Sequence, residues 1–136
     1  MRELVLFYSY AGHTKKIAEA FAQESGSDVC EVIDIKRPNI FRALLLAGKH
    51  GTLPIEPLQI SGEAVRFEDY GVVNVFAPIW NGQFAAAMRS AVELLPKGMK
   101  VRLSLVSGGG KSKKDAITAQ MRKLSLEVIG YEDIKG

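Results

Sequence analysis

The chain has 136 residues, 47% of them hydrophobic and 24% charged, and this ordinary globular composition excludes a disordered chain and predicts one domain over residues 1–136. The formal net charge of +3 comes from scattered basic residues without interleaved aromatic ones, so we expect no nucleic-acid partner. The single cysteine, Cys30, excludes an internal disulfide, and no apolar run approaches the ~18 residues of a membrane span. We therefore expect a cytoplasmic protein with no membrane partner.

The N-terminal part of the chain has the pattern of a strand, a loop, a helix and a second strand. Residues 4–8 form a short apolar run that is typical of a strand buried on both faces. Apolar residues then recur at helical spacing from Ile17 to Ala22, and Gly26 marks the end of that helix. Residues 29–35 predict the second strand.

The middle of the chain is irregular. Residues 40–47 are apolar and predict a short helix, after which the segment from Gly48 to Pro57 contains two glycines and two prolines. These residues oppose long regular structure, so we expect a loop there. A loop of this length in a small domain is typical of a functional segment.

The second half predicts three more strands and two more helices. Strands are expected over residues 71–79, 100–106 and 131–134. One helical stripe runs from Phe84 to Leu95 and another from Ile117 to Val128, which Gly130 would close. This alternation of strands and helices predicts right-handed βαβ units and a doubly wound five-stranded parallel sheet.

Ligands of such sheets bind beyond the carboxyl ends of the strands, so the loops after strands one, three and four are the candidate site. The first loop, residues 9–14, precedes a helix whose first backbone N–H groups have no intrahelical partner, and it can bind an anion such as phosphate. A simple capped turn is the alternative. In the second loop, Trp80 can stack on a planar ligand, or it can pack as core.

The third loop holds three consecutive glycines, which allow close approach of a ligand or form a plain flexible connection. No side chains have the spacing of a catalytic triad or a metal site. The candidate binding residues are Ser9, Tyr10, Ala11, Gly12, His13, Thr14, Pro78, Ile79, Trp80, Asn81, Gly82, Gln83, Ser107, Gly108, Gly109 and Gly110.

These three loops resemble those of the flavodoxin family. The segments LVLFYSYAGHTKKIAEAFA, APIWNGQFAAAMRSAVELL and VSGGGKSKKD look like the family's phosphate loop and its two ring loops. The segment RPNIFRALLLAGKHG, followed by IEPL, resembles short prokaryotic members. One departure is Ala11, which stands where the family usually has a hydroxyl residue.

The resemblance implies strand order 2-1-3-4-5 and noncovalently bound FMN. The phosphate would lie on residues 9–14 and the ring between residues 78–83 and 107–110, with Trp80 stacked on it. The resemblance also implies electron transfer with a redox partner protein. The alternatives left open are a flavin-dependent NAD(P)H:quinone-type oxidoreductase and a flavodoxin-fold scaffold that no longer binds flavin.

Two departures lead to further expectations. Lys111, Lys113 and Lys114 follow the third loop, where flavodoxins are often acidic, so we expect a less negative reduction potential and acidic partners. The chain also ends where the family usually continues into a last helix. We expect this to leave an apolar sheet face exposed, which a homodimer or a partner protein would cover.

Overall fold

Five parallel strands form the centre of the fold in the computed structural model, which describes residues 2–35, 54–59, 64–108 and 111–135. Numbered along the chain, these five lie in the order 2-1-3-4-5, which confirms the predicted topology. In their spatial order they are β2 (Asp28–Asp34), β1 (Glu3–Phe7), β4 (Val72–Trp80), β6 (Lys100–Ser107) and β7 (Glu127–Lys135).

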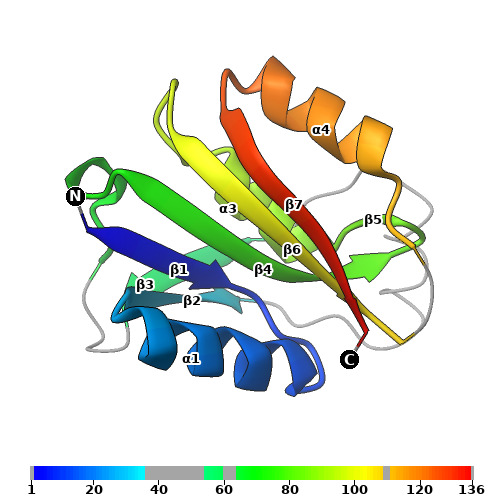
Figure 1. The fold of residues 1–136 in the computed structure, drawn as a ribbon, viewed down its shortest axis with the longest axis horizontal. Coiled ribbons are helices and arrows are strands. Elements are labelled where there is room, and N and C mark those ends of the chain that lie inside the picture. The colour runs from blue at the N-terminus through cyan, green and yellow to red at the C-terminus, as the bar shows by residue number, and fades with distance from the viewer. Residues whose placement is uncertain (1, 36–53, 60–63, 109–110, 136) are drawn as a thin grey trace.

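Helices cover both faces of this sheet (Figure 1). Side chains of a strand alternate between faces, and β1 shows it clearly. Leu4 and Leu6 belong to the core cluster beneath α3 and α4, whereas Val5 and Phe7 pack with residues of α1. These side chains are completely buried, and each contributes about 1.5–3 kcal/mol. The helices are α1 (His13–Ser25), α3 (Ala86–Val92) and α4 (Lys114–Lys123), with a 3₁₀ turn, η1 (Phe67–Asp69), before β4.

The expected long loop contains a strand. β3 (Ile55–Gln59) pairs antiparallel with β2 at the edge of the described sheet, so the expectation of a loop through Pro57 is wrong. Pro57 lies opposite Val32 in this pairing. An edge strand tolerates proline because one side of its backbone needs no hydrogen-bond partner in the sheet. The helix expected over residues 40–47 lies outside the described residues.

A short hairpin replaces the start of the second predicted helix. β5 (Gln83–Phe84) pairs antiparallel with the end of β4. The turn between them is formed by Asn81 and Gly82, both with positive φ, 52° and 78°. An Asn-Gly pair favours this two-residue hairpin turn. Phe84 is therefore a strand residue, and the helix begins only at Ala86.

The last helix ends earlier than its apolar stripe predicts. α4 stops at Lys123, Ser125 takes a left-handed conformation (φ 59°), and the Leu126 N–H donates to the Met121 carbonyl at 3.0 Å. This is the hydrogen-bond pattern of a Schellman helix end. The chain then enters β7, so Val128 and Gly130 are strand residues and the predicted closure by Gly130 is wrong.

Polar groups lie on the α1 side of the sheet. Asn74 donates from Nδ2 to Glu3 Oε1 (2.9 Å), and Arg102 Nη1 donates to the same oxygen (2.7 Å). The Asn74 hydrogen bond, assisted by Arg102, holds the pKa of Glu3 below its usual value. These contacts link β1, β4 and β6 across one face. The exposed apolar face expected from the missing last helix, and the homodimer inferred from it, stay predictions. Among the described helices, none has the length and apolar character to cross a bilayer.

Candidate functional site

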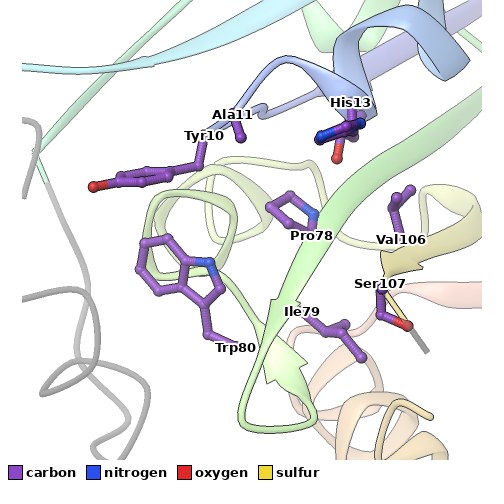
Figure 2. A pocket seen from close by; sticks show the side chains of 10 residues that line it. Tyr10, Ala11, His13, Pro78, Ile79, Trp80, Val106 and Ser107 are labelled. Atoms are coloured by element: carbon purple, nitrogen blue, oxygen red, sulfur yellow. The ribbon is translucent and has the colours of Figure 1, made fainter. Parts of the chain in front are cut away.

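A pocket of about 240 Å³ lies where β1, β4 and β6 end. It brings together residues from all three predicted loops (Figure 2). Tyr10 and Trp80 form one side of the view, and His13, Val106 and Ser107 form the other. The lining residues are Tyr10, Ala11, His13, Thr14, Pro78, Ile79, Trp80, Val106, Ser107 and Gly108.

The first loop is held by its own short-range contacts. The Gly12 N–H donates to Ser9 Oγ at 2.9 Å, which closes the turn directly before α1. Gly12 has φ 97°, a left-handed conformation that favours glycine. Helical hydrogen bonding begins when the Lys16 N–H donates to the Gly12 carbonyl. The N–H groups of the first helical turn lack intrahelical acceptors, and the residues that carry them, His13 and Thr14, line the pocket.

Ser9 and Gly12 support this loop without lining the pocket. The Ser9 side chain accepts the internal hydrogen bond, so its oxygen shapes the loop, while its own O–H is a donor. Thr14 is 3% exposed and lies at the base of the loop. His13 is exposed at the rim. The loop therefore presents a hydroxyl, an imidazole and backbone donors to one cavity, which is a donor set suited to an anion.

An aromatic cluster forms the opposite wall. The Tyr10 and Trp80 rings meet edge to face, with centroids 5.8 Å apart and planes at 85°. Trp80 also contacts the buried Tyr8 ring, at 6.4 Å and 78°. Trp80 packs against the main core cluster and lines the pocket at the same time. The core-packing alternative therefore holds in part, and stacking on a planar ligand stays a prediction.

The hairpin after Trp80 separates the remaining residues of the second loop from the pocket. Asn81 and Gly82 form its turn, and neither lines the pocket. Gln83 lines a separate groove between α3 and α4, together with Arg89. Burial lowers the pKa of the Arg89 guanidinium, and its Nε donates to the Phe84 carbonyl at 2.9 Å.

The second and third loops contact each other directly. The Lys113 N–H donates to the Gly82 carbonyl at 2.7 Å. A Cβ on Gly82 would lie 2.8 Å from Lys113 Cγ, so glycine at this position makes room for the lysine stem. Ser107 and Gly108 line the pocket, and Gly109 and Gly110 lie outside the described residues.

The end of the third loop is tied to β7. Ser112 Oγ donates to Asp133 Oδ1 at 2.6 Å and also contacts the Tyr131 hydroxyl. Burial raises the pKa of Tyr131, and the Lys114 ammonium lies 5.3 Å from the centre of its ring. Lys113 and Lys114 therefore contact different partners, Gly82 and Tyr131.

The sequence prediction missed one residue that lines the pocket, Val106. Val106 is opposite Pro78 in the β4–β6 register, which brings both to the pocket. The signal was its position as the last apolar residue of the fourth strand.

Burial raises the pKa of Cys30 to about 12, so its thiol is not a nucleophile at neutral pH. The part of the chain that the structure describes contains no group of three His, Cys, Asp or Glu residues arranged for a metal ion.

No protein-family model and no curated protein matches the sequence. The structure is similar to a flavoprotein from Lactobacillus acidophilus NCFM crystallised with FMN, at 20% identity and TM-score 0.76, over 97% of this chain and 92% of that one. It is also similar to a provisionally assigned flavoprotein from Bacteroides eggerthii DSM 20697, at 18% identity and TM-score 0.82, over 99% and 89% of the two chains. Flavodoxin from Megasphaera elsdenii matches at 18% identity and TM-score 0.51, over 98% and 85%. Together with the strand order, these likenesses show that the chain has the flavodoxin-like fold.

Proposed function

We propose that this chain binds FMN in the pocket at the ends of β1, β4 and β6 and acts as an electron-transfer protein. The observation that carries the proposal is the meeting of two unlike surfaces in one cavity. Hydrogen-bond donors from the start of α1 lie on one side, and the Tyr10–Trp80 aromatic wall lies on the other. A phosphate ester attached to a planar ring requires both surfaces. The FMN-bound flavoprotein of L. acidophilus, which shares the fold, supports the same ligand.

The first loop would hold the phosphate. Backbone N–H groups at a helix start and the helix dipole favour an anion there by about 0.3–1 kcal/mol or more where it is partly buried. Thr14 and His13 line the same side, and the hydroxyl and imidazole can donate to phosphate oxygens. Ala11 has no hydroxyl, but its backbone N–H remains, so this departure removes one contact without removing the site.

The ring would lie between the aromatic wall and the third loop. Trp80 is half-buried and presents its indole to the pocket (Figure 2). Ser107 and Gly108 form the facing edge, where the small glycine allows a flat ring to approach the backbone. When bound, FMN supplies the electron-transfer chemistry, and the protein residues orient it and adjust its electrostatic surroundings.

The charges around the pocket favour an acidic redox partner. Exposed lysines follow the third loop and begin α1, and His13 lies at the rim. Positive charge near the ring would also stabilise its reduced, anionic form and make the potential less negative. Lys113 is the residue to test because its stem packs on the hairpin that carries Trp80. Lys114 is the matched control because its ammonium lies over Tyr131.

Potentiometry on FMN-loaded protein tests this electrostatic assignment. We expect Lys113→Gln to make the reduction potential more negative and Lys114→Gln to change it less, since the Lys113 stem packs on the hairpin that carries Trp80 and the Lys114 ammonium lies over Tyr131. Equal shifts for the two variants, or no shift for Lys113→Gln, would contradict it.

Equilibrium titration tests the proposal as a whole. Flavin-free protein is added to FMN, and we expect saturable quenching of the flavin fluorescence at a 1:1 ratio, because Trp80 stacks on the ring. Unchanged fluorescence at all protein concentrations would leave only a scaffold with this fold.

Steady-state oxidation of NADH or NADPH with a quinone acceptor separates the two redox roles, electron carrier and reductase. An electron carrier gives negligible turnover, and rapid turnover would assign the chain as a reductase instead.

A further inference from the structure

Beyond ligand binding, the aromatic wall continues into the core and ends at a carboxylate. Trp80, the only tryptophan of the chain, contacts the Tyr8 ring edge to face at 6.4 Å. The Tyr8 hydroxyl donates to Asp34 Oδ2 at 2.9 Å. Tyr8 is 2% exposed, whereas Asp34 at the end of β2 is half-buried and reaches solvent. A path of contacting groups therefore leads from the pocket to the surface on the far side of Tyr8.

This arrangement matches the chemical requirements for one-electron oxidation of a tyrosine. Removing an electron from a phenol makes its O–H strongly acidic, so oxidation is favourable only where a base accepts the proton. An ionised carboxylate is such an acceptor, and a hydrogen bond of ordinary length places it at the phenolic O–H. With the proton accepted, a tyrosine is easier to oxidise than a tryptophan at neutral pH, so electrons flow from Tyr8 toward Trp80. The two rings are in contact, and this permits rapid transfer.

We propose that Tyr8, Trp80 and Asp34 form an electron relay that returns an electron to oxidised Trp80. A one-electron oxidant at the pocket takes an electron from Trp80 and leaves its radical cation. Tyr8 then gives one electron to Trp80, and the phenolic proton moves to the Asp34 carboxylate. The net result is a reduced oxidant, an intact Trp80, a neutral Tyr8 phenoxyl radical and a protonated Asp34. The relay consists of the chain's own side chains and does not depend on the proposed function, although a light-excited flavin would be a suitable oxidant.

The chain contains a second tyrosine–aspartate pair that serves as a matched control. The Tyr70 hydroxyl donates to Asp28 Oδ2 at 2.8 Å. Tyr70 precedes β4 and Trp80 ends it, so about 30 Å of strand separates them. This pair has the same tyrosine-to-carboxylate hydrogen bond without the contact to tryptophan, and Arg2 also pairs with Asp28 and donates to the Tyr70 hydroxyl. Tyr10 is a second comparison, because its ring also contacts Trp80, with centroids 5.8 Å apart, and its hydroxyl points away from the cavity (Figure 2).

Pulse radiolysis of the flavin-free full chain tests the relay. Azide radicals oxidise tryptophan by one electron, and the absorption of tryptophan and tyrosine radicals is followed over time. We expect the tryptophan signal to decay with a concentration-independent rate while a tyrosine signal grows at the same rate. Tyr8→Phe should remove most of this growth, and Tyr70→Phe should leave it unchanged. Asp34→Asn, which keeps a hydrogen-bond acceptor of the same shape, should slow it.

Specific results would overturn the proposal. One is an unchanged growth of the tyrosine-radical signal in Tyr8→Phe, and another is loss of that growth in Tyr10→Phe instead. The third is an unchanged rate of that growth in Asp34→Asn. Circular dichroism of each variant confirms that the fold is retained, since each change alters only one polar group. The titration with FMN is a separate measurement, so failure of the relay and failure of flavin binding are distinguishable.

Discussion

The two ends of the pocket are built in different ways. The end proposed for phosphate is the loop of residues 9–14, apart from the Tyr10 side chain in the aromatic wall, and its shaping contact joins Ser9 to Gly12, three residues apart. The end proposed for the ring joins distant segments. Lys113 contacts Gly82, and Ser112 contacts Asp133 on the last strand. One end is local in sequence, and the other depends on the assembled sheet.

This difference predicts different responses to substitution. A change in the local loop should affect recognition of the phosphate and leave ring binding intact. A substitution at the ring end should also disturb the neighbouring segments, because these segments position one another. Riboflavin, which has the ring but no phosphate, separates the two effects when its affinity is measured beside that of FMN.

The largest effect is expected for Trp80→Ala. Loss of a stacked aromatic surface costs about 1–3 kcal/mol, so FMN affinity should fall about ten- to a hundredfold. Riboflavin affinity should fall by the same factor, because Trp80 belongs to the ring end. Trp80→Phe keeps an aromatic face and should retain most of the affinity. Fluorescence titration measures all four values, and a loss confined to FMN would contradict the assignment of this end.

The next effect is expected for Gly12→Ala. A non-glycine residue in the left-handed conformation costs about 1–2 kcal/mol, so the loop should leave its binding shape and FMN affinity should fall about tenfold. Riboflavin affinity should stay constant. Gly26→Ala is the matched control, since Gly26 at the other end of α1 also has positive φ and open space for a Cβ. Both variants should lose similar free energy of unfolding, and only Gly12→Ala should lose phosphate recognition.

A smaller effect tests the contact between the second and third loops. Gly82→Ala would bring a methyl group against Lys113 and also strain the turn. In a Lys113→Ala background the clash is absent. The two substitutions should therefore be non-additive in the free energy of unfolding, with a coupling of about 1 kcal/mol. Strict additivity in denaturant unfolding would show that the two loops are independent.

The smallest effect concerns the tether to β7. Ser112→Ala removes one charge-assisted hydrogen bond that is partly exposed, worth about 1 kcal/mol or less, so FMN affinity should fall about twofold to fivefold. Riboflavin affinity should follow it. Ser25→Ala, which removes a hydrogen bond at the exposed end of α1, should leave both affinities unchanged. An equal loss of FMN affinity in the two variants would show that the Ser112–Asp133 hydrogen bond does not support the site.

The same contrast explains what the sequence could predict. Residues 9–14 could be identified because the apolar strand, the glycine and the following helix are adjacent in sequence, and their physical roles are local. The five parallel strands could be predicted for the same reason. Their order required the family resemblance, because pairing of distant strands leaves little local signal.

The sequence-based predictions are wrong where contacts between residues distant in sequence, or uncommon backbone conformations, determine the structure. Pro57 opposed a strand, and only its edge position allows β3. Ser125 ends α4 in a conformation usually taken by glycine, so the apolar stripe ran on to Val128. The Asn81–Gly82 hairpin could have been predicted, since this dipeptide favours a two-residue turn. It directs Gln83 away from the pocket toward the α3–α4 groove.

One comparison tests the central claim most directly: the affinities of the flavin-free wild-type protein for FMN and for riboflavin, measured under the same conditions. The account predicts that FMN binds saturably and far more tightly, because the donors at the start of α1 bind the phosphate. Equal affinities, or no binding of FMN, would contradict the assignment of residues 9–14 as a phosphate site.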